Sequence, residues 1–151
     1  AGIVSKQSSA KRLQVGAIVV KEDRIISIGY NGMPAGWDNN CEKKVYSELS
    51  PELLQREQYR DEDGGTYYLT TRPEVIHAEA NAIAKLAKYS ESGAGSTMFL
   101  THAPCIDRAK QIFTAGINKV FYGKHYRDTV GIEFLNKCGV QVKRWDIGEN
   151  I

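Results

Sequence analysis

The chain has 151 residues, of which 42% are hydrophobic and 25% are charged. These values fit one ordinary globular domain covering residues 1–151, and a chain of this length can bury a core without disulfide bonds. Its 20 basic and 18 acidic residues leave a formal net charge of +2. This near balance argues against nucleic-acid binding through bulk charge and favours a small-molecule partner.

The sequence does not read as that of a membrane protein. No apolar run approaches the ~20 residues of a membrane span, and no basic and then apolar leader opens the chain, so we expect a cytoplasmic protein. The first residue is Ala1 rather than Met, and we expect a processed or truncated start and a longer N-terminal helix. The cysteines are sparse and odd in number, which leaves metal binding, thiol chemistry or burial instead of a disulfide framework: Cys41, Cys105 and Cys138.

The first half of the chain predicts a hairpin, a loop and one helix. β-Branched runs over 13–20 and 24–30 flank a turn-like Lys-Glu-Asp and indicate an antiparallel hairpin. The Gly, Pro and Asn content of 31–41 indicates a long ordered loop. A Ser-Pro pair is a helix-start signal and predicts a helix over 50–60. The acids and glycines of 61–65 end that helix in a flexible insert.

The second half of the chain alternates helices and strands. Pro73 can start a helix to about Tyr89, because apolar residues recur along one helical face. The elements expected after it are strand 97–101, helix 104–115, strand 119–122, helix 128–138 and strand 140–145. Strands that alternate with helices imply parallel strands joined by crossover helices. The sequence therefore predicts an α/β fold, with a mixed central sheet of about five strands and helices on both faces.

The start of the helix over 73–89 carries an imidazole and a carboxylate, at His77 and Glu79. Alone, this pair fits a solvated first turn that His77 caps. Cys105 follows His77 by 28 residues, after a proline, directly behind a strand and at the start of the next helix. If the two helix starts meet beside the ends of their strands, His77 and Cys105 face one point. An imidazole and a thiolate at one point suit zinc.

These residues stand in an order that resembles the zinc-dependent cytidine and deoxycytidylate deaminases. The signature of that family is H-x-E followed by P-C-x-x-C, and the chain has His77-Ala78-Glu79 and then Pro104-Cys105. Three blocks are similar to the deoxycytidylate (dCMP) deaminases of the family: the Val-Gly-Ala of 15–17, the Gly-Tyr-Asn-Gly-Met-Pro-Ala-Gly of 29–36 and the run 77–83. The resemblance covers nearly the whole chain and implies the three-layer cytidine deaminase-like fold.

The resemblance implies the hydrolytic deamination of dCMP to dUMP and ammonia, a reaction that supplies dUMP for thymidylate synthesis. Zinc lowers the pKa of a bound water to about 7, and the resulting hydroxide attacks C4 of the cytosine ring. Glu79 matches the glutamate that moves protons between this water, ring N3 and the leaving ammonia. Asn31 matches a loop asparagine that holds the sugar and the base edge. Ala78 offers backbone polar groups beside the base, and Tyr126 matches a tyrosine near the substrate.

Other binding roles are less specific. Lys11, Arg12 or Arg127 could meet the nucleotide phosphate, although each also fits an ordinary solvated surface charge, and Tyr126 fits packing as well as binding. Family members that resemble this chain are homohexamers that dCTP activates and dTTP inhibits, so we expect a homo-oligomer with these nucleotides, dCMP and dUMP as its ligands. The expected effector contact is the glycine-rich loop, made of Asn31, Gly32, Met33, Pro34, Ala35 and Gly36.

The sequence departs from the family at one metal-ligand position. The second cysteine of P-C-x-x-C would fall at residue 108, where the chain has Arg108. A guanidinium stays protonated and cannot be a zinc ligand. His77 and Cys105 are then two protein ligands, where a catalytic zinc has three and a water. The departure predicts impaired zinc binding and catalysis, as in an inactivated or regulatory form or an engineered variant, unless Arg108 turns away and metal binds weakly.

Several arrangements around Arg108 remain open. Its guanidinium could take over part of the charge of zinc by pairing with the Cys105 thiolate and with Glu79, or it could lie exposed on a reshaped helix start. His102, three residues before Cys105, could offer a makeshift third ligand. The leading hypothesis is a dCMP deaminase, and the alternative, which Arg108 favours, is a catalytically silent nucleotide-binding homologue.

A second, structural zinc is not expected. Some phage members of the family hold one with cysteines near the loop and with a histidine two residues before the catalytic histidine. This chain has Val75 at that position, and no cysteine precedes Cys41. We therefore expect Cys41 and Cys138 to be buried as free thiols.

Overall fold

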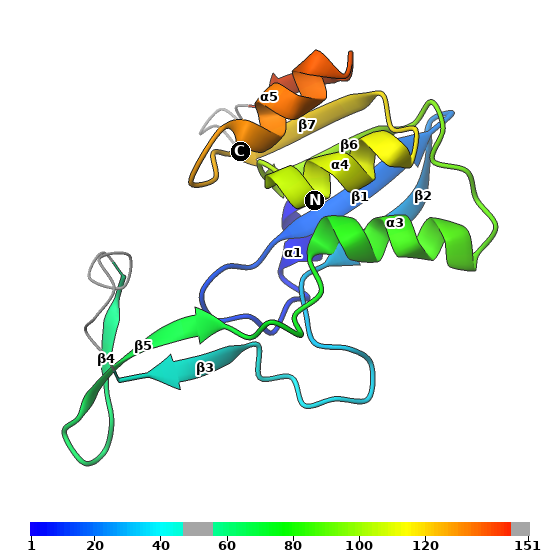
Figure 1. Cartoon of the computed structure of the whole chain (residues 1–151). Helices are drawn as coiled ribbons and strands as arrows, with labels where there is room; N and C mark the ends of the chain where they lie inside the picture. Colours follow the sequence, from blue (N-terminus) through cyan, green and yellow to red (C-terminus); the bar gives the residue numbers. More distant parts are fainter. Residues whose placement is uncertain (47–55, 146–151) are drawn as a thin grey trace.

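The computed structural model describes residues 1–46 and 56–145. Its centre is a five-stranded sheet in the order β2-β1-β6-β7-β8 (Figure 1). The strands are β1 (Gly16–Lys21), β2 (Arg24–Tyr30), β6 (Thr97–His102), β7 (Lys119–Lys124) and β8 (Gln141–Arg144). Strand β1 is antiparallel to both of its neighbours, whereas β6, β7 and β8 are parallel. The predicted hairpin and mixed sheet of five strands are confirmed.

Helices cover both faces of this sheet, as predicted. The helices are α1 (Gly2–Ser5), α3 (Ala78–Lys88), α4 (Ile106–Thr114) and α5 (Val130–Lys137). A Cβ built on Gly29 would lie 2.2 Å from the Ala78 carbonyl oxygen, so α3 packs directly on β2. A Cβ on Gly16 would lie 2.4 Å from the Ala1 carbonyl oxygen and 2.6 Å from the Ser5 nitrogen. Gly16 neighbours Ala17, the cross-strand partner of Gly29, so α1 lies on the opposite face.

The main core lies between the sheet and the three longer helices (Figure 1). Alternate residues of the central strands point toward these helices, as the period of two requires. The buried side chains that meet there include Ala17, Val19, Met98, Leu100, Val120 and Tyr122 from the strands and Ala82, Leu86, Ile112 and Leu135 from the helices. This packing fixes the first turns of α3 and α4 at neighbouring places beside the sheet.

A second sheet, which the sequence did not predict, extends away from the first (Figure 1). It contains β3 (Glu42–Val45), β5 (Thr66–Thr71) and β4 (Gln58–Arg60) in the order β3-β5-β4, with both pairs antiparallel. The helix predicted over 50–60 is therefore wrong at 58–60, and its first residues lie outside the described part of the chain.

The physical reason for this difference is cross-strand pairing. Tyr59 stacks on Tyr67 with ring centroids 5.6 Å apart, and such aromatic pairs stabilise neighbouring strands. The residues 61–65, predicted as a flexible insert, form the turn between β4 and β5, where the Asp61 amide donates to the Gly65 carbonyl at 2.7 Å. The Asp61 carboxylate accepts hydrogen bonds from Lys44 and Tyr46. The pairing of β3 with β5 and the bonds of Asp61 to Lys44 and Tyr46 join residues 15 or more positions apart in sequence, and together with the β4-β5 turn they outweigh the local helix signal.

The central helix begins later than predicted, at Ala78 instead of Pro73. The residues before it are extended, because Ile76 exchanges two backbone hydrogen bonds with Gly32, at 2.9 and 3.1 Å. His77 is consequently the N-cap residue of α3. Within the described ranges, no helix has the length and apolar character to cross a membrane.

Gly29 gives a direct test of how tightly α3 is seated. Gly29→Ala should lower the free energy of unfolding by about 3 kcal/mol, because the new methyl group would collide with the backbone of α3 at Ala78 and Ala82. Gly65→Ala is the matched control, since a Cβ there meets nothing within 4 Å, and its effect should stay within about 0.5 kcal/mol. Urea denaturation of both variants provides the measurement, and a Gly29→Ala protein as stable as the parent would contradict this packing.

Candidate functional site

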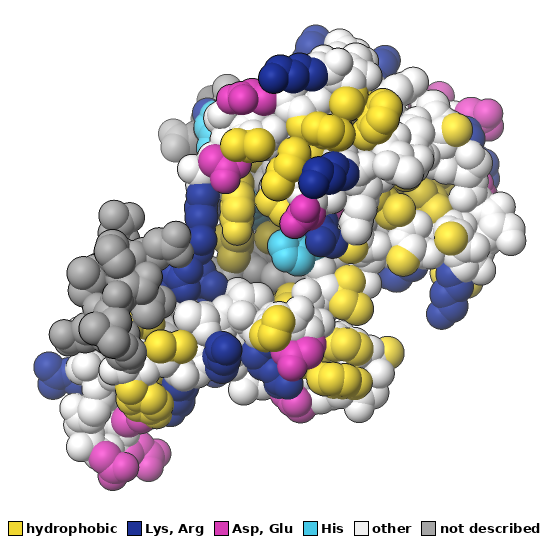
Figure 2. Space-filling view, in the orientation of Figure 1, with side chains coloured by type: hydrophobic (Ala, Val, Ile, Leu, Met, Phe, Trp, Pro, Cys, Tyr) yellow, Lys and Arg dark blue, Asp and Glu magenta, His cyan; other side chains and the backbone are white. Residues whose placement is uncertain are grey.

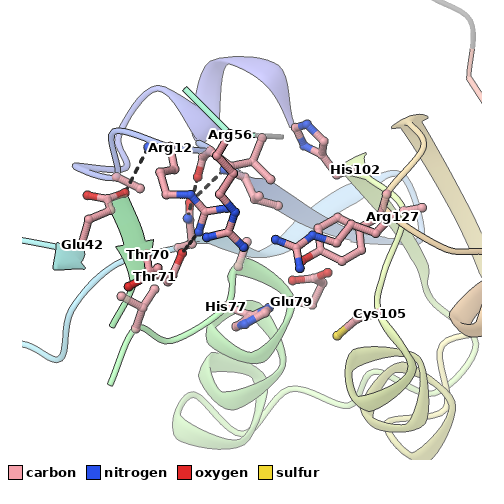
Figure 3. A pocket seen from close by; sticks show the side chains of 18 residues that line it. Arg12, Glu42, Arg56, Thr70, Thr71, His77, Glu79, His102, Cys105 and Arg127 are labelled. Carbon is pink, nitrogen blue, oxygen red and sulfur yellow. Dashed lines mark hydrogen bonds between the residues drawn. The ribbon is translucent and has the colours of Figure 1, made fainter. Parts of the chain in front are cut away.

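A cavity of about 350 Å³ opens between the main body and the three-stranded sheet. Figure 2 shows a histidine in the hollow between the two parts, with Lys and Arg side chains gathered near it. His77 and Cys105 stand at the N-cap positions of α3 and α4, and neither side chain makes a capping hydrogen bond. Both line the cavity together with Glu79 (Figure 3). The structure therefore brings the sequence-predicted trio to one place.

Glu79 is the buried acid at the helix starts of this cavity. Its side chain is only 4% exposed, although a first-turn carboxylate would ordinarily be solvated. Burial raises the pKa of the Glu79 carboxyl above its usual value, and a hydrogen bond from its own backbone amide and then the charge of Arg108 oppose that rise only partly. A raised pKa brings a carboxyl group closer to the pH range in which it can both donate and accept a proton, which is the property that a general acid/base requires.

His77 and Cys105 complete the group at the two helix starts. Partial burial lowers the pKa of the His77 imidazole, and the positive charge of Arg108 lowers it further. The neutral imidazole that this favours has a nitrogen lone pair available to a ligand. Cys105 is a free, half-buried cysteine. Two donors typical of a zinc site are thus present.

Arg108 occupies the position at which the family signature has the third ligand of the catalytic zinc site. Its Nη1 donates to Gln111 Oε1 at 3.3 Å along α4, and its Nε is buried without a hydrogen-bond partner in the described structure. In residues 1–46 and 56–145, no three His, Cys, Asp or Glu side chains are grouped so that they could hold a metal ion. Since a catalytic zinc has three protein ligands, the residues present do not fit the metal.

The makeshift ligand considered in the sequence, His102, does not repair the site. It lines the cavity, but its Nδ1 lies 3.0 Å from Thr101 Oγ1, and it forms no three-ligand group with His77 and Cys105 in the part of the chain that is described. Figure 3 shows it well separated from Cys105 in this view. That hypothesis is wrong for this conformation of the protein.

Three arginines line the cavity: Arg12, Arg56 and Arg127. In the view of Figure 3, Arg12 and Arg56 lie together on the side away from Cys105, whereas Arg127 lies beside Glu79. The pKa of the Arg12 guanidinium is lowered first by burial and then by the like charges of Arg56 and Arg127, so the three charges are close enough to act together. Arg12 Nη1 is also held by Thr71 Oγ1 at 2.8 Å. This cluster suits an anionic group, and sequence reasoning missed Arg56 because that residue lies in the segment 50–60, which the sequence predicted to be a helix rather than part of a site.

The remaining sequence-predicted residues differ in how they meet the cavity. Ala78, which is fully buried, lines it, as do Asn31 and the partly exposed Tyr126, whose ring centroid lies 6.0 Å from the Arg127 guanidinium carbon. Asn31 accepts a hydrogen bond from the Val15 amide and donates one to the Leu13 carbonyl, each at 2.8 Å. Its side chain therefore holds the neighbouring loop. Lys11, Arg108 and the loop 32–36 are not among the residues that line this cavity.

Two polar residues of the second sheet line the same cavity without any signal in the sequence, Glu42 and Thr70. Glu42 is 4% exposed, and Glu42 Oε2 and Thr70 Oγ1 are buried with no hydrogen-bond partner in the described residues. Neither residue belongs to a recognisable motif. Their strands form by pairing distant segments, so local sequence patterns gave no reason to select them.

Comparison with known proteins agrees with this geometry. Residues 3–124 match the family model described as the cytidine and deoxycytidylate deaminase zinc-binding region. The deoxycytidylate deaminase of enterobacteria phage T4 is 34% identical over 160 residues, covering 93% of this chain and 83% of the phage protein. The human deoxycytidylate deaminase is 33% identical, covering 93% of this chain and 72% of the human protein.

A solved structure extends the similarity to the fold. The crystal structure of dCMP deaminase from the cyanophage S-TIM5 in complex with dCMP and dUMP superposes with a TM-score of 0.77 at 42% identity, covering 96% of this chain and 90% of the cyanophage chain. The α/β architecture is thus that of a dCMP deaminase. From the matched signature, the fold and these relatives together, the chain belongs to the cytidine and deoxycytidylate deaminase family and is a homologue of its dCMP deaminases.

Proposed function

We propose that this protein binds dCMP in the cavity between the two sheets, and that Arg108 withholds the zinc-dependent step that would convert it to dUMP and ammonia. The observation that carries the proposal is the pairing, in one cavity, of a buried acid at the helix starts with a cluster of three arginines. A pyrimidine nucleotide has matching parts, a base that exchanges protons and a dianionic phosphate. Relatives of the chain that are dCMP deaminases support this choice of nucleotide.

The base would lie beside the start of α3. Glu79 offers a carboxyl group that can donate a proton to the base or accept one from it. Glu79 is only 4% exposed, so bulk water does not compete with the base for this carboxyl group. The backbone of Ala78 and the side chains of Asn31 and Tyr126 line the adjacent wall. Because His77 and Cys105 are two donors where three are needed, no step of a reaction is assigned to a metal in this chain.

The phosphate would lie among Arg12, Arg56 and Arg127. Guanidinium groups bind phosphate oxygens through short charge-assisted hydrogen bonds. Burial lowers the pKa of Arg12 most, and repulsion from Arg56 and Arg127 lowers it further; an incoming dianion would relieve this repulsion. This end of the cavity therefore selects a nucleoside monophosphate over an uncharged nucleoside.

The proposal retains the family resemblance for assembly and regulation. A homohexamer with dCTP as activator and dTTP as inhibitor would use the loop over Asn31, Gly32, Met33, Pro34, Ala35 and Gly36 at a contact between copies. Two observations support a separate role for this loop. Residues 32–36 do not line the cavity, and Gly32 is joined by backbone hydrogen bonds to Ile76, the residue directly before His77. A nucleotide bound at the loop would then act on the start of α3.

Phosphate selection can be measured without any turnover. The parent should bind dCMP at least about tenfold more tightly than deoxycytidine, and Arg12→Gln should reduce that ratio to about threefold or less, since a hydrogen bond to a charged group contributes about 1.5–3 kcal/mol. Isothermal titration calorimetry of both ligands gives the ratio. Lys137→Gln, which removes a cation outside the cavity, is the control, and equal binding of the two ligands by the parent would refute the arginine subsite.

Catalysis is tested by restoring the missing ligand. With zinc present, Arg108→Cys should release ammonia from dCMP, whereas the parent should be at least about a hundredfold slower, because only the variant has three protein ligands and a free position for water. Arg108→Ser is the matched control: it removes the guanidinium and has nearly the shape of cysteine but adds no thiolate, so it should remain slow.

The role of Glu79 is tested in the same active background. Adding Glu79→Gln to Arg108→Cys should reduce ammonia release by about a hundredfold or more. For the Arg108→Cys comparison itself, the contradicting result is a parent that releases ammonia as fast as Arg108→Cys, which would show that Arg108 does not limit the reaction.

A further inference from the structure

The second sheet contributes to the cavity wall a carboxylate, that of Glu42, of which only one oxygen has hydrogen-bond partners. Glu42 Oε1 accepts hydrogen bonds from the backbone amides of Lys11 at 2.8 Å and Arg12 at 3.0 Å. These two bonds fix the side chain, which is 4% exposed. Its other oxygen, Oε2, is buried and has no hydrogen-bond partner in the described residues. Glu42 is therefore held rigidly with one strong acceptor to spare.

An unpartnered buried carboxylate oxygen is unfavourable, and buried polar groups normally have a partner. The arginines that share the cavity do not supply one, since no ion pair joins Glu42 to a cation in residues 1–46 and 56–145. Thr70 Oγ1, which is buried and equally without a partner there, belongs to the same wall. The wall is suited to a ligand group that donates a hydrogen bond.

The arginine cluster and Glu42 have opposite requirements of one ligand. Arg12, Arg56 and Arg127 require an anion, whereas Glu42 requires a donor, and an ionised phosphate has acceptors only. Figure 3 shows Glu42 on the far side of Arg12 from His77 and Glu79. The ligand group that donates a hydrogen bond to Glu42 is therefore not the nucleotide base, which would lie beside Glu79. In a deoxynucleotide, the donor that remains is the hydroxyl group of the sugar.

We propose that Glu42 Oε2 accepts a hydrogen bond from the 3′-hydroxyl of the bound deoxynucleotide, which makes Glu42 a specificity-determining residue; this rests on the proposed function. Asn31 is less able to do so, because its amide oxygen and nitrogen are engaged by Val15 and Leu13. The same carboxylate holds the backbone of Arg12 through Oε1. Glu42 thereby links the sugar to the loop that carries a phosphate-binding arginine.

The test compares dCMP with 2′,3′-dideoxycytidine monophosphate, which lacks only the 3′-hydroxyl. Isothermal titration calorimetry on the full chain should show dCMP binding at least about tenfold more tightly. In Glu42→Gln, which keeps an oxygen for the amides of Lys11 and Arg12 but replaces the charged acceptor, the ratio should fall to about threefold or less. Glu62→Gln, on an exposed turn outside the cavity, should keep the parental ratio.

The ratio separates a sugar contact from a merely structural role. Loss of loop structure in Glu42→Gln would weaken both nucleotides and leave their ratio unchanged, which would overturn the inference. Equal binding of the two nucleotides by the parent would overturn it as well, without any variant and with the proposed function intact. If the parent binds neither nucleotide, the proposed function and this inference fail together.

Discussion

The site depends on the close approach of the central helix to strand β2. Because Gly29 has no side chain, the backbone of α3 at Ala78 and Ala82 can lie directly on the sheet. Further hydrogen bonds hold it there: Ser27 Oγ donates to the Ala82 carbonyl at 2.7 Å, and Asn81 Nδ2 donates to the Tyr30 carbonyl at 2.8 Å. The first turn of α3 is thereby fixed, and with it the positions of His77 and Glu79. Displacement of this helix would move the acid relative to Arg12 and Arg56, which lie apart from it in Figure 3.

In this arrangement, the residues suited to binding an anion and those suited to proton transfer or metal binding come from different elements of the fold. The arginines and Glu42 come from loops and the second sheet, while Glu79, His77 and Cys105 come from helix starts on the first sheet. Arg108 is not among the residues that line the cavity, so the departure at position 108 involves no member of the first group. A cavity of this kind can keep its affinity for a nucleotide when turnover is reduced, because binding energy and the activated water have different sources.

Sequence patterns predicted the five-stranded sheet and the trio of His77, Glu79 and Cys105, because periodicity and short motifs are local signals. The second sheet was not predictable in this way: Tyr59 and Tyr67 stabilise each other only after their strands have paired. Glu42 could not be predicted as a site residue for the same reason, since the backbone amides that donate hydrogen bonds to its side chain lie 30 and 31 residues away in sequence. The start of α3 was misplaced for a related reason, the backbone pairing of Ile76 with the distant Gly32.

Arg108 is the clearest departure of this chain from the family signature, because it stands where P-C-x-x-C has its second cysteine. Its guanidinium replaces a ligand and, through its charge, lowers the pKa of His77, so it disfavours a cation at the helix starts both by ligand count and by repulsion. The most direct measurement is the zinc content per chain of the parent and of Arg108→Cys, purified alike with zinc present and then freed of loosely bound metal. The account predicts about one zinc for Arg108→Cys and less than about 0.1 for the parent. A parent that carries about one zinc per chain would contradict it.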